Sequence, residues 1–200
     1  GTAAELNTVN AGTTSAVNAN AVVTIESSTA SDLATLMADA QDAAKFTNTS
    51  FVDLTTNGVT ITGGTTIDVT DLNNAISRTN TVATGTVDLV FSADNTTTTI
   101  NGGTATEFAT TLLTHKTNNR VSFTGVNLSI DGTTVTTAQA NDLTAATTGT
   151  VTTTVSDGDL DTLTGLNAKS NAALAVTVTD TAGTAAELNT VNAGTTSAVN

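Results

Sequence analysis

A five-residue pattern recurs along the chain and predicts where helices begin. A hydroxyl or carboxyl residue is followed three positions later by Asp or Glu, and then directly by Leu or Phe. The first side chain can accept a free backbone N–H of the first helical turn, and the acid can reach back while lying in the positive field of the helix N-terminus. The pattern occurs at Thr2, Glu5 and Leu6; Thr29, Asp32 and Leu33; Asp68, Asp71 and Leu72; Thr104, Glu107 and Phe108; Ser156, Asp159 and Leu160; and Thr184, Glu187 and Leu188.

Each of these starts is expected to lead into a short amphipathic helix. The Leu or Phe is the first residue that the helix should bury, and a second apolar residue three or four positions later should share its face, as Val9 does with Leu6. A degraded form of the pattern lies at residues 139–143. Apolar residues at helical spacing predict three longer helices, at 30–46, 69–78 and 105–116.

Between the helices the apolar pattern changes to period two, which is typical of strands. Predicted strands lie at residues 22–25, 51–54, 59–61, 87–91, 121–123, 126–130, 151–155 and 174–178. Glycine-containing turns are expected at residues 57–58, 63–64, 101–103 and 131–132, because glycine and asparagine tolerate positive φ.

Residues 1–18 recur without change as residues 183–200, an offset of 183 − 1 = 182 positions. Recent tandem duplication or homogenisation explains such identity, and we expect the parent chain to continue in both directions. Residues 1–182 would form one long repeat of about six helix-strand coils, and residues 183–200 would begin the next. The sequence therefore predicts a β-rich α/β solenoid with one short helix per coil and largely parallel sheets; the alternative is an all-β repeat fibre.

The composition agrees with thin repeated layers and restricts the partners. Threonine makes up about a quarter of the chain, while aromatic residues make up 2% and there is no Cys, Pro, Trp or Tyr. The formal net charge of −13 disfavours binding to nucleic acid and to anionic membranes. No stretch has the length and hydrophobicity of a membrane span, and no secretion leader opens the sequence.

Candidate chemistry is sparse. The single histidine, His115, lies at the end of the helix predicted to begin at Thr104, where a cation would favour the helix C-terminus. Asp157, Asp159 and Asp161 stand at alternate positions, as in several calcium loops, so calcium is the one cofactor that the sequence suggests. Asp159 already has a role as a helix-start acid. Because no nucleophile elbow, phosphate loop or zinc spacing is present, we expect a protein without catalytic activity.

The run from Thr2 to Val17, and the related run from Asp159 to Leu166, resemble the repeats of very large Thr/Asn-rich surface and secreted proteins of bacteria, cyanobacteria especially. They also resemble, more weakly, the repeats of phage tail fibres. The first resemblance implies a structural repeat module of an extracellular filament, sheath, surface layer or adhesin stalk at the cell surface. Its partners would be neighbouring repeats, lateral copies or polysaccharide. A phage tail-fibre shaft is the first alternative, and a secreted β-helix carbohydrate-active protein is the second.

Overall fold

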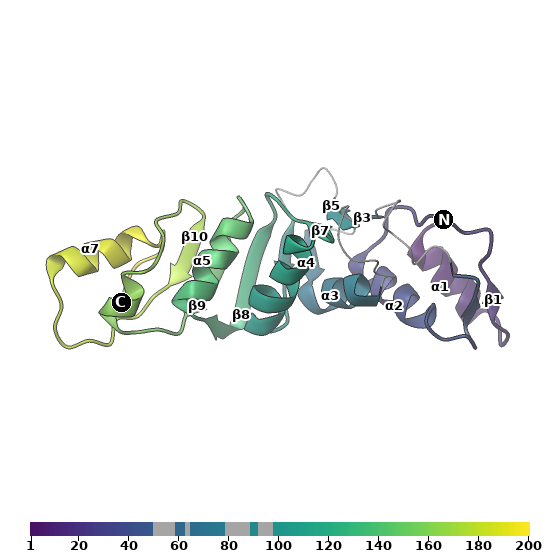
Figure 1. The fold of residues 1–200 in the computed structure, drawn as a ribbon, viewed down its shortest axis with the longest axis horizontal. Coiled ribbons are helices and arrows are strands. Elements are labelled where there is room, and N and C mark those ends of the chain that lie inside the picture. The colour runs from purple at the N-terminus through teal and green to yellow at the C-terminus, as the bar shows by residue number, and fades with distance from the viewer. Residues whose placement is uncertain (50–58, 63–64, 79–88, 92–97) are drawn as a thin grey trace. The chain divides into compact units, whose positions relative to one another are not determined.

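The computed structural model describes residues 1–49, 59–62, 65–78, 89–91 and 98–200 (Figure 1). The chain divides into two compact units, which are described separately. The first unit comprises Gly1–Asn95 and Thr114–Phe123, and the second comprises Thr96–Leu113 and Thr124–Asn200.

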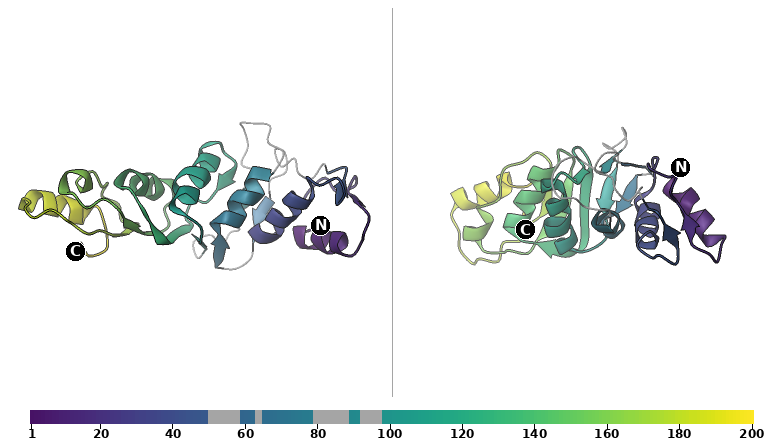
Figure 2. Two further views of the ribbon diagram at one scale, coloured as in Figure 1. Left: turned by 90° about the horizontal axis from the view of Figure 1, so that it is seen from below. Right: turned by 45° about the vertical axis from the view of Figure 1, so that its right-hand side comes forward.

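The first unit combines packed helices with short parallel strands. Its described elements are α1 (Ala3–Ala11), β1 (Val17–Asn18), α2 (Ala30–Asp39), β2 (Phe46–Thr47), β3 (Val59–Ile61), β4 (Thr66–Asp68), α3 (Val69–Arg78), β5 (Leu89–Phe91), most of α4 (Leu113–Thr117) and β7 (Val121–Ser122). Helix α2 packs against both α1 and α3, and α1 and α2 lie side by side in both views of Figure 2. Fully buried Leu33, Leu36, Met37, Leu72 and Ile76 form this helical core. The parallel pairs are β1 with β2, β3 with β5, and β5 with β7.

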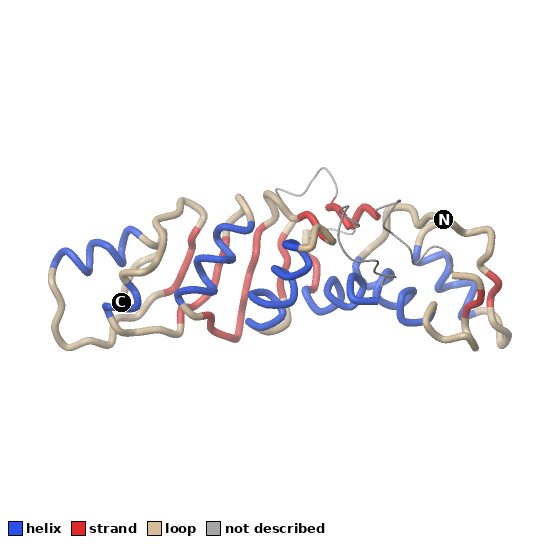
Figure 3. Tube along the Cα trace, in the orientation of Figure 1, coloured by secondary structure: helices blue, strands red, loops and turns tan. Residues whose placement is uncertain are grey.

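The second unit contains a parallel sheet with helices packed beside it. Its elements are β6 (Thr99–Asn101), a π-helical segment η2 (Glu107–Leu112), β8 (Asn127–Val135), α5 (Thr137–Ala146), β9 (Val151–Val155), α6 (Leu160–Leu163), β10 (Ala172–Ala175) and α7 (Ala185–Ala193). Strands β6, β8, β9 and β10 are neighbours in that order, and every pair is parallel. Figure 3 shows helix α5 running beside the strands of this sheet.

Strand β9 shows why the threonine-rich sequence can form a sheet. Val151, Thr153 and Val155 are buried, whereas Thr152 and Thr154 are exposed. The β-branched side chains fit a pleated surface, and on the solvent side the threonine hydroxyls remain accessible to water. Alternation of valine and threonine therefore gives one apolar and one hydrated face.

The predicted fold class is wrong. The described residues form a mixed α/β structure of seven α-helices and parallel sheets in two compact units, which is neither a β-rich solenoid nor an all-β fibre. The predicted solenoid has one short helix per coil beside its strands. In the first unit, however, α2 and α3 bury their apolar faces largely against each other, so helix-helix packing builds the core.

Several element boundaries also differ from the prediction. The helix expected over 30–46 ends at Asp39, because the Asp42 carbonyl accepts the N–H groups of Lys45 and Phe46 in a turn and Phe46 then enters β2. Residues 22–25 form no strand. The turn expected at 131–132 lies inside β8, where Gly132 has φ of 73° and the register with β9 shifts.

Other predicted strands and turns either differ from the structure or lie outside the described residues. The strand predicted at 174–178 is displaced, because β10 ends at Ala175. The strand at 51–54, the turns at 57–58 and 63–64, and residues 87–88 lie outside the described residues.

The expectation that Leu6 and Val9 share a buried face is wrong. Leu6 is half-buried on α1, while Val9 is 54% exposed. In the identical helix α7 the order is reversed, because Val191 is fully buried and Leu188 is 43% exposed. The two positions are neighbours on the helix surface, and only the second copy buries the valine.

Candidate functional site

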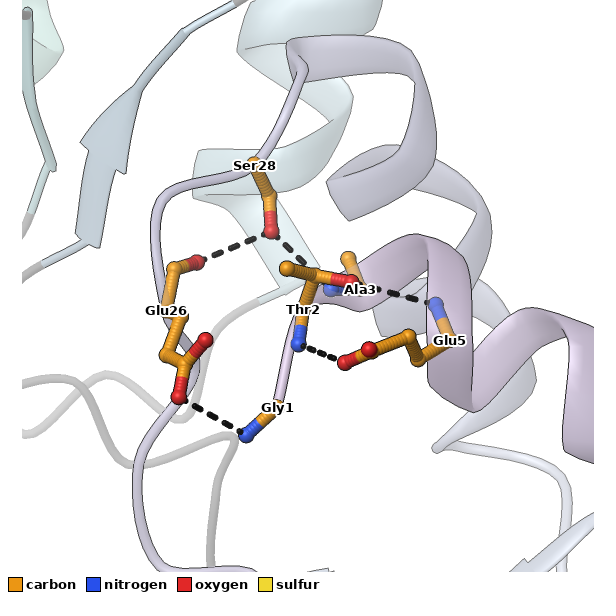
Figure 4. Close-up of polar contacts among 6 residues, drawn as sticks. All are labelled: Gly1, Thr2, Ala3, Glu5, Glu26 and Ser28. Carbon is orange, nitrogen blue, oxygen red and sulfur yellow. Dashed lines mark hydrogen bonds and ion pairs between the residues drawn. The ribbon is translucent and has the colours of Figure 1, made fainter.

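The helix starts of the two identical segments are closed by reciprocal hydrogen bonds. The Glu5 N–H donates to Thr2 Oγ1 at 3.2 Å, and Glu5 Oε2 accepts the Thr2 N–H at 2.8 Å (Figure 4). At α7 the corresponding distances between Thr184 and Glu187 are 3.2 and 2.7 Å. These bonds favour the ionised carboxylate and lower the pKa of both Glu5 and Glu187. Both glutamates therefore act as backbone acceptors.

Three further helix starts use the predicted residues in related ways. The Thr29 hydroxyl accepts the Asp32 N–H at 3.0 Å, and Asp68 Oδ1 accepts the Asp71 N–H at 3.2 Å. The Thr104 N–H donates to Glu107 Oε2 at 2.8 Å. The next residue in each case, Leu33, Leu72 or Phe108, is fully buried, so the start also fixes which side chain enters the core.

Two predicted helix starts need correction. Ser156 is not a cap, because its N–H and hydroxyl both donate to the Val135 carbonyl. Asp159 caps α6 itself by accepting the Thr162 N–H at 2.9 Å, and Leu160 is the first helical residue. The degraded pattern at 139–143 was placed too late in the sequence, since α5 is capped by a reciprocal pair formed by Thr136 and Gln139.

The three aspartates suggested as calcium ligands have separate surroundings. Asp157 Oδ2 accepts the Thr137 N–H at 2.6 Å, Asp159 caps α6 with a lowered pKa caused by its hydrogen bonds with Thr162, and Asp161 is exposed in the first turn of α6. Among the residues that the structure describes, no group of three His, Cys, Asp or Glu side chains is placed to hold a metal ion. Calcium binding by these aspartates stays a prediction.

A set of residues missed in the sequence links successive segments at the helix starts. The first helical N–H of α1, at Ala3, donates to Ser28 Oγ at 2.9 Å (Figure 4). The first N–H of α5 donates to Asp157, and the first N–H of α6, at Leu160, donates to Asp180 Oδ2 at 2.6 Å. Each acceptor lies 20 to 25 residues further along the chain. Each also stands one to four positions before the cap of the following helix, a signal that the five-residue pattern did not include.

Asparagine side chains make the same kind of link. Asn7 Nδ2 donates to the Asp32 carbonyl at 3.0 Å, and Asn10 Nδ2 donates to Asp39 Oδ2 at 2.9 Å. Asn141 donates to the Gly165 carbonyl and accepts the Asn167 N–H. Primary amides can donate and accept at once, so one side chain holds two neighbouring segments in register.

His115 does not have the predicted charge. Its side chain is 8% exposed, and its Nε2 lies 3.3 Å from Ser77 Oγ. Burial, with a smaller contribution from the Arg120 charge, lowers its pKa to about 4, so the ring is neutral near pH 7. The predicted cationic role at the helix C-terminus is therefore wrong. A group with this pKa is also a weak general base at neutral pH, despite its contact with a hydroxyl.

These contacts bring together polar groups that hold segments in place. Helix-start carboxylates accept backbone N–H groups, and the one histidine is neutral beside Arg120. None of the helices within the described ranges has the length and apolar character needed to cross a membrane. No family model, curated protein or solved structure matches the chain significantly.

Proposed function

We propose that the chain is a non-catalytic structural module of a repetitive extracellular bacterial protein, such as a filament, sheath, surface layer or adhesin stalk. One observation carries this proposal. Two identical 18-residue segments form helices with the same bounds relative to the repeat and the same reciprocal cap, although their neighbours in the fold differ. A sequence that is identical at both places and folds alike at both behaves as a repeated structural unit.

The polar contacts support the same role. Ser28, Asp157 and Asp180 link the starts of α1, α5 and α6 to segments further along the chain, and Asn7 and Asn141 add side-chain links of the same reach. Such contacts fix the spacing of successive segments. Neighbouring repeats of the same protein are therefore the proposed partners, with exposed threonine and asparagine available for lateral copies or polysaccharide.

The negative charge suits an exposed and crowded protein. A formal net charge of −13 on 200 residues makes separate copies repel one another except where specific contacts overcome the repulsion. Repulsion of this kind keeps a repetitive surface hydrated and limits non-specific aggregation. It also sets the proposed function apart from binding of phosphate backbones or anionic lipids.

Antibodies raised against the recombinant chain test the proposed location. We expect them to label intact cells of the source bacterium as strongly as permeabilised cells, and mechanical shear to release the labelled material. Labelling of permeabilised cells alone would overturn the proposal, and labelling of phage particles would favour the tail-fibre alternative. A parallel incubation with a panel of polysaccharides should release no new reducing ends; measurable release would identify an enzyme.

A further inference from the structure

The two identical segments bury different sides of the same helix. In the first copy, residues 1–18, Ala3 is fully buried, whereas Val9 is 54% exposed. In the second copy, residues 183–200, Val191 is fully buried, whereas Ala185 is exposed and Leu188 is 43% exposed. The sequence is the same, so the difference arises from the neighbours of each copy.

Within the described residues, the contacts of the first copy are with α2 and the segments beside it. The Ala3 N–H donates to Ser28 (Figure 4), Asn7 donates to the Asp32 carbonyl, and Asn10 donates to the Asp39 carboxylate. Positions 3, 7 and 10 form one stripe along α1, and α2 covers that stripe. This stripe is named the forward face.

Within the described residues, the contacts of the second copy are with α6, β10 and the residues beside them. Val191 is buried on this side, and the Thr195 hydroxyl accepts the Leu174 N–H at 3.0 Å. The Thr196 N–H donates to the Ala172 carbonyl at 2.7 Å. This second side of the segment, around positions 9, 13 and 14 of the first copy, is named the backward face.

The extended ends of the two copies also use opposite edges. The N–H groups of Val17, in the first copy, and of Ala19, directly after it, donate to the carbonyls of Lys45 and Thr47, at 2.8 and 2.9 Å. In the second copy the N–H of Asn200 donates to the Val176 carbonyl at 3.0 Å. Successive N–H groups of an extended strand point to opposite sides, so the two sets of hydrogen bonds are compatible in one strand.

The glycines of the segment are explained only in the second copy. A Cβ on Gly194 would lie 2.5 Å from Leu166 Cβ, and one on Gly183 would overlap Leu160. Gly12, the equivalent of Gly194, has φ of −82° and would place a Cβ at ordinary contact distance. The absence of a side chain at Gly194 therefore permits a contact on the backward face that the first copy does not make in this structure.

The uncovered forward face of the second copy is hollowed. A depression of about 450 Å³ is lined by Leu188, Asn189, Asn192, Val199 and Asn200, together with Val178 and Asp180. The first five correspond to Leu6, Asn7, Asn10, Val17 and Asn18. In the first copy Asn7, Asn10 and Val17 bond to residues of the segment 19–47.

We propose that the 18-residue segment is a two-faced junction, and that the forward face of residues 183–200 is the docking site for a second copy of the segment 19–47. The occupant is identified by identity of sequence: residues 19–47 already cover this face where it occurs as residues 1–18. Asn189 and Asn192 would donate to the second copies of Asp32 and Asp39, and Val199 N–H to the second copy of Lys45. The proposed junction does not depend on whether the protein is located at the cell surface.

A chain in which a second copy of residues 19–200 follows Asn200 tests the junction, because residues 183–200 then have both neighbours. The chain has no cysteine, so single Ala185→Cys and Ala186→Cys variants report the two exposed positions separately. Thiol labelling at Ala185→Cys should be about tenfold or more slower in the extended chain than in the 200-residue chain. Labelling at Ala186→Cys, whose equivalent Ala4 is exposed in the covered first copy, should be unchanged.

Equal labelling of Ala185→Cys in the two chains would overturn the proposal. Because a cysteine at this position can itself disturb the packing, hydrogen exchange on the unsubstituted chains provides a second measurement. The Val199 amide should exchange about tenfold or more slowly in the extended chain. An unchanged exchange rate there, with native circular dichroism, would overturn the junction even if the cysteine variant failed to fold.

Discussion

At the residue scale, hydroxyl and carboxylate oxygens are used repeatedly as acceptors for backbone N–H groups. Asp159 caps its own helix, whereas Asp157 satisfies the first N–H of α5 from twenty positions away. The local pair could be predicted from sequence, because both partners lie within one helical turn. The distant pair could not, because its partner is determined by the packing of segments far apart in the chain.

Removing the Asp157 carboxylate should therefore cost more stability than removing the adjacent exposed Asp161. We expect Asp157→Ala to lower the free energy of unfolding by about 1 to 3 kcal/mol, since a partly buried N–H loses its charged acceptor. Asp161→Ala removes the same charge and should cost about 0.5 kcal/mol. Chemical denaturation measures both, and equal losses would contradict the structural role of Asp157. Melting temperatures of the unsubstituted chain that agree in excess calcium and in excess chelator would contradict calcium binding by these aspartates.

His115 should make stability depend on pH in a defined window. Its pKa is about 4 in the folded chain and 6.5 when exposed, so the unfolded chain takes up the proton first as pH falls. Protonation then favours unfolding, and the loss begins below pH 6.5 and is complete near pH 4. Between pH 7 and 4.5 the chain should lose roughly 2 to 3 kcal/mol more than a His115→Gln variant. Equal losses of unfolding free energy in the two chains over this pH range would contradict a buried neutral ring.

At the element scale, α1 and α7 show how far burial depends on neighbours. Both have the same sequence and the same cap, yet Val9 is exposed and Val191 is buried. The helix start was predictable because it depends on five consecutive residues. The buried side of the helix could not be predicted. Apolar residues lie on two sides of this helix, and its own sequence does not determine which neighbour packs against it.

The same substitution in the two helices should therefore have different effects. Val191→Ala should destabilise the chain by about 1 to 2 kcal/mol through lost burial and the cavity left behind. Val9→Ala should change stability by less than about 0.5 kcal/mol, as at other exposed positions. Chemical denaturation measures both changes, and the denaturant midpoints of the two variants can be compared when their m-values are equal. A larger loss at Val9 would mean that the backward face of the first copy is covered in solution.

Glycine substitutions at the helix ends give an independent test of the same asymmetry. Gly194→Ala should destabilise by about 1 to 3 kcal/mol, because the new methyl group meets Leu166. Gly12→Ala has ordinary contacts and a negative φ, so it should be neutral or stabilising by up to about 1 kcal/mol. The melting temperatures of the two variants should therefore differ, with Gly194→Ala the lower. Matching shifts would contradict a steric requirement for glycine at position 194.

At the scale of the whole molecule, local patterns were a poor guide to architecture. Helix starts and the alternation in β9 are properties of a few consecutive residues, and they were accessible from the sequence. The share of the core formed by helix-helix packing could not be predicted from the sequence. The apolar face of α2 can pack on strands or on another helix. In the structure it packs on α1 and α3, which is why the expected β-rich class fails.

A chain that begins at residue 19 should associate head to tail. It lacks α1, so residues 19–47 are uncovered, while its own residues 183–200 carry the sequence that was removed. The two faces differ, so each molecule can bind one neighbour through each face, which makes the association head to tail. Sedimentation should show size increasing with concentration, whereas the 200-residue chain stays monomeric. Leu188→Asp, at an exposed position, should abolish association without unfolding the chain, and excess peptide 1–18 should compete. Association that persists with Leu188→Asp would instead indicate contact outside the junction, because the equivalent Leu6 is half-buried in the covered first copy and a charged carboxylate there would weaken the contact.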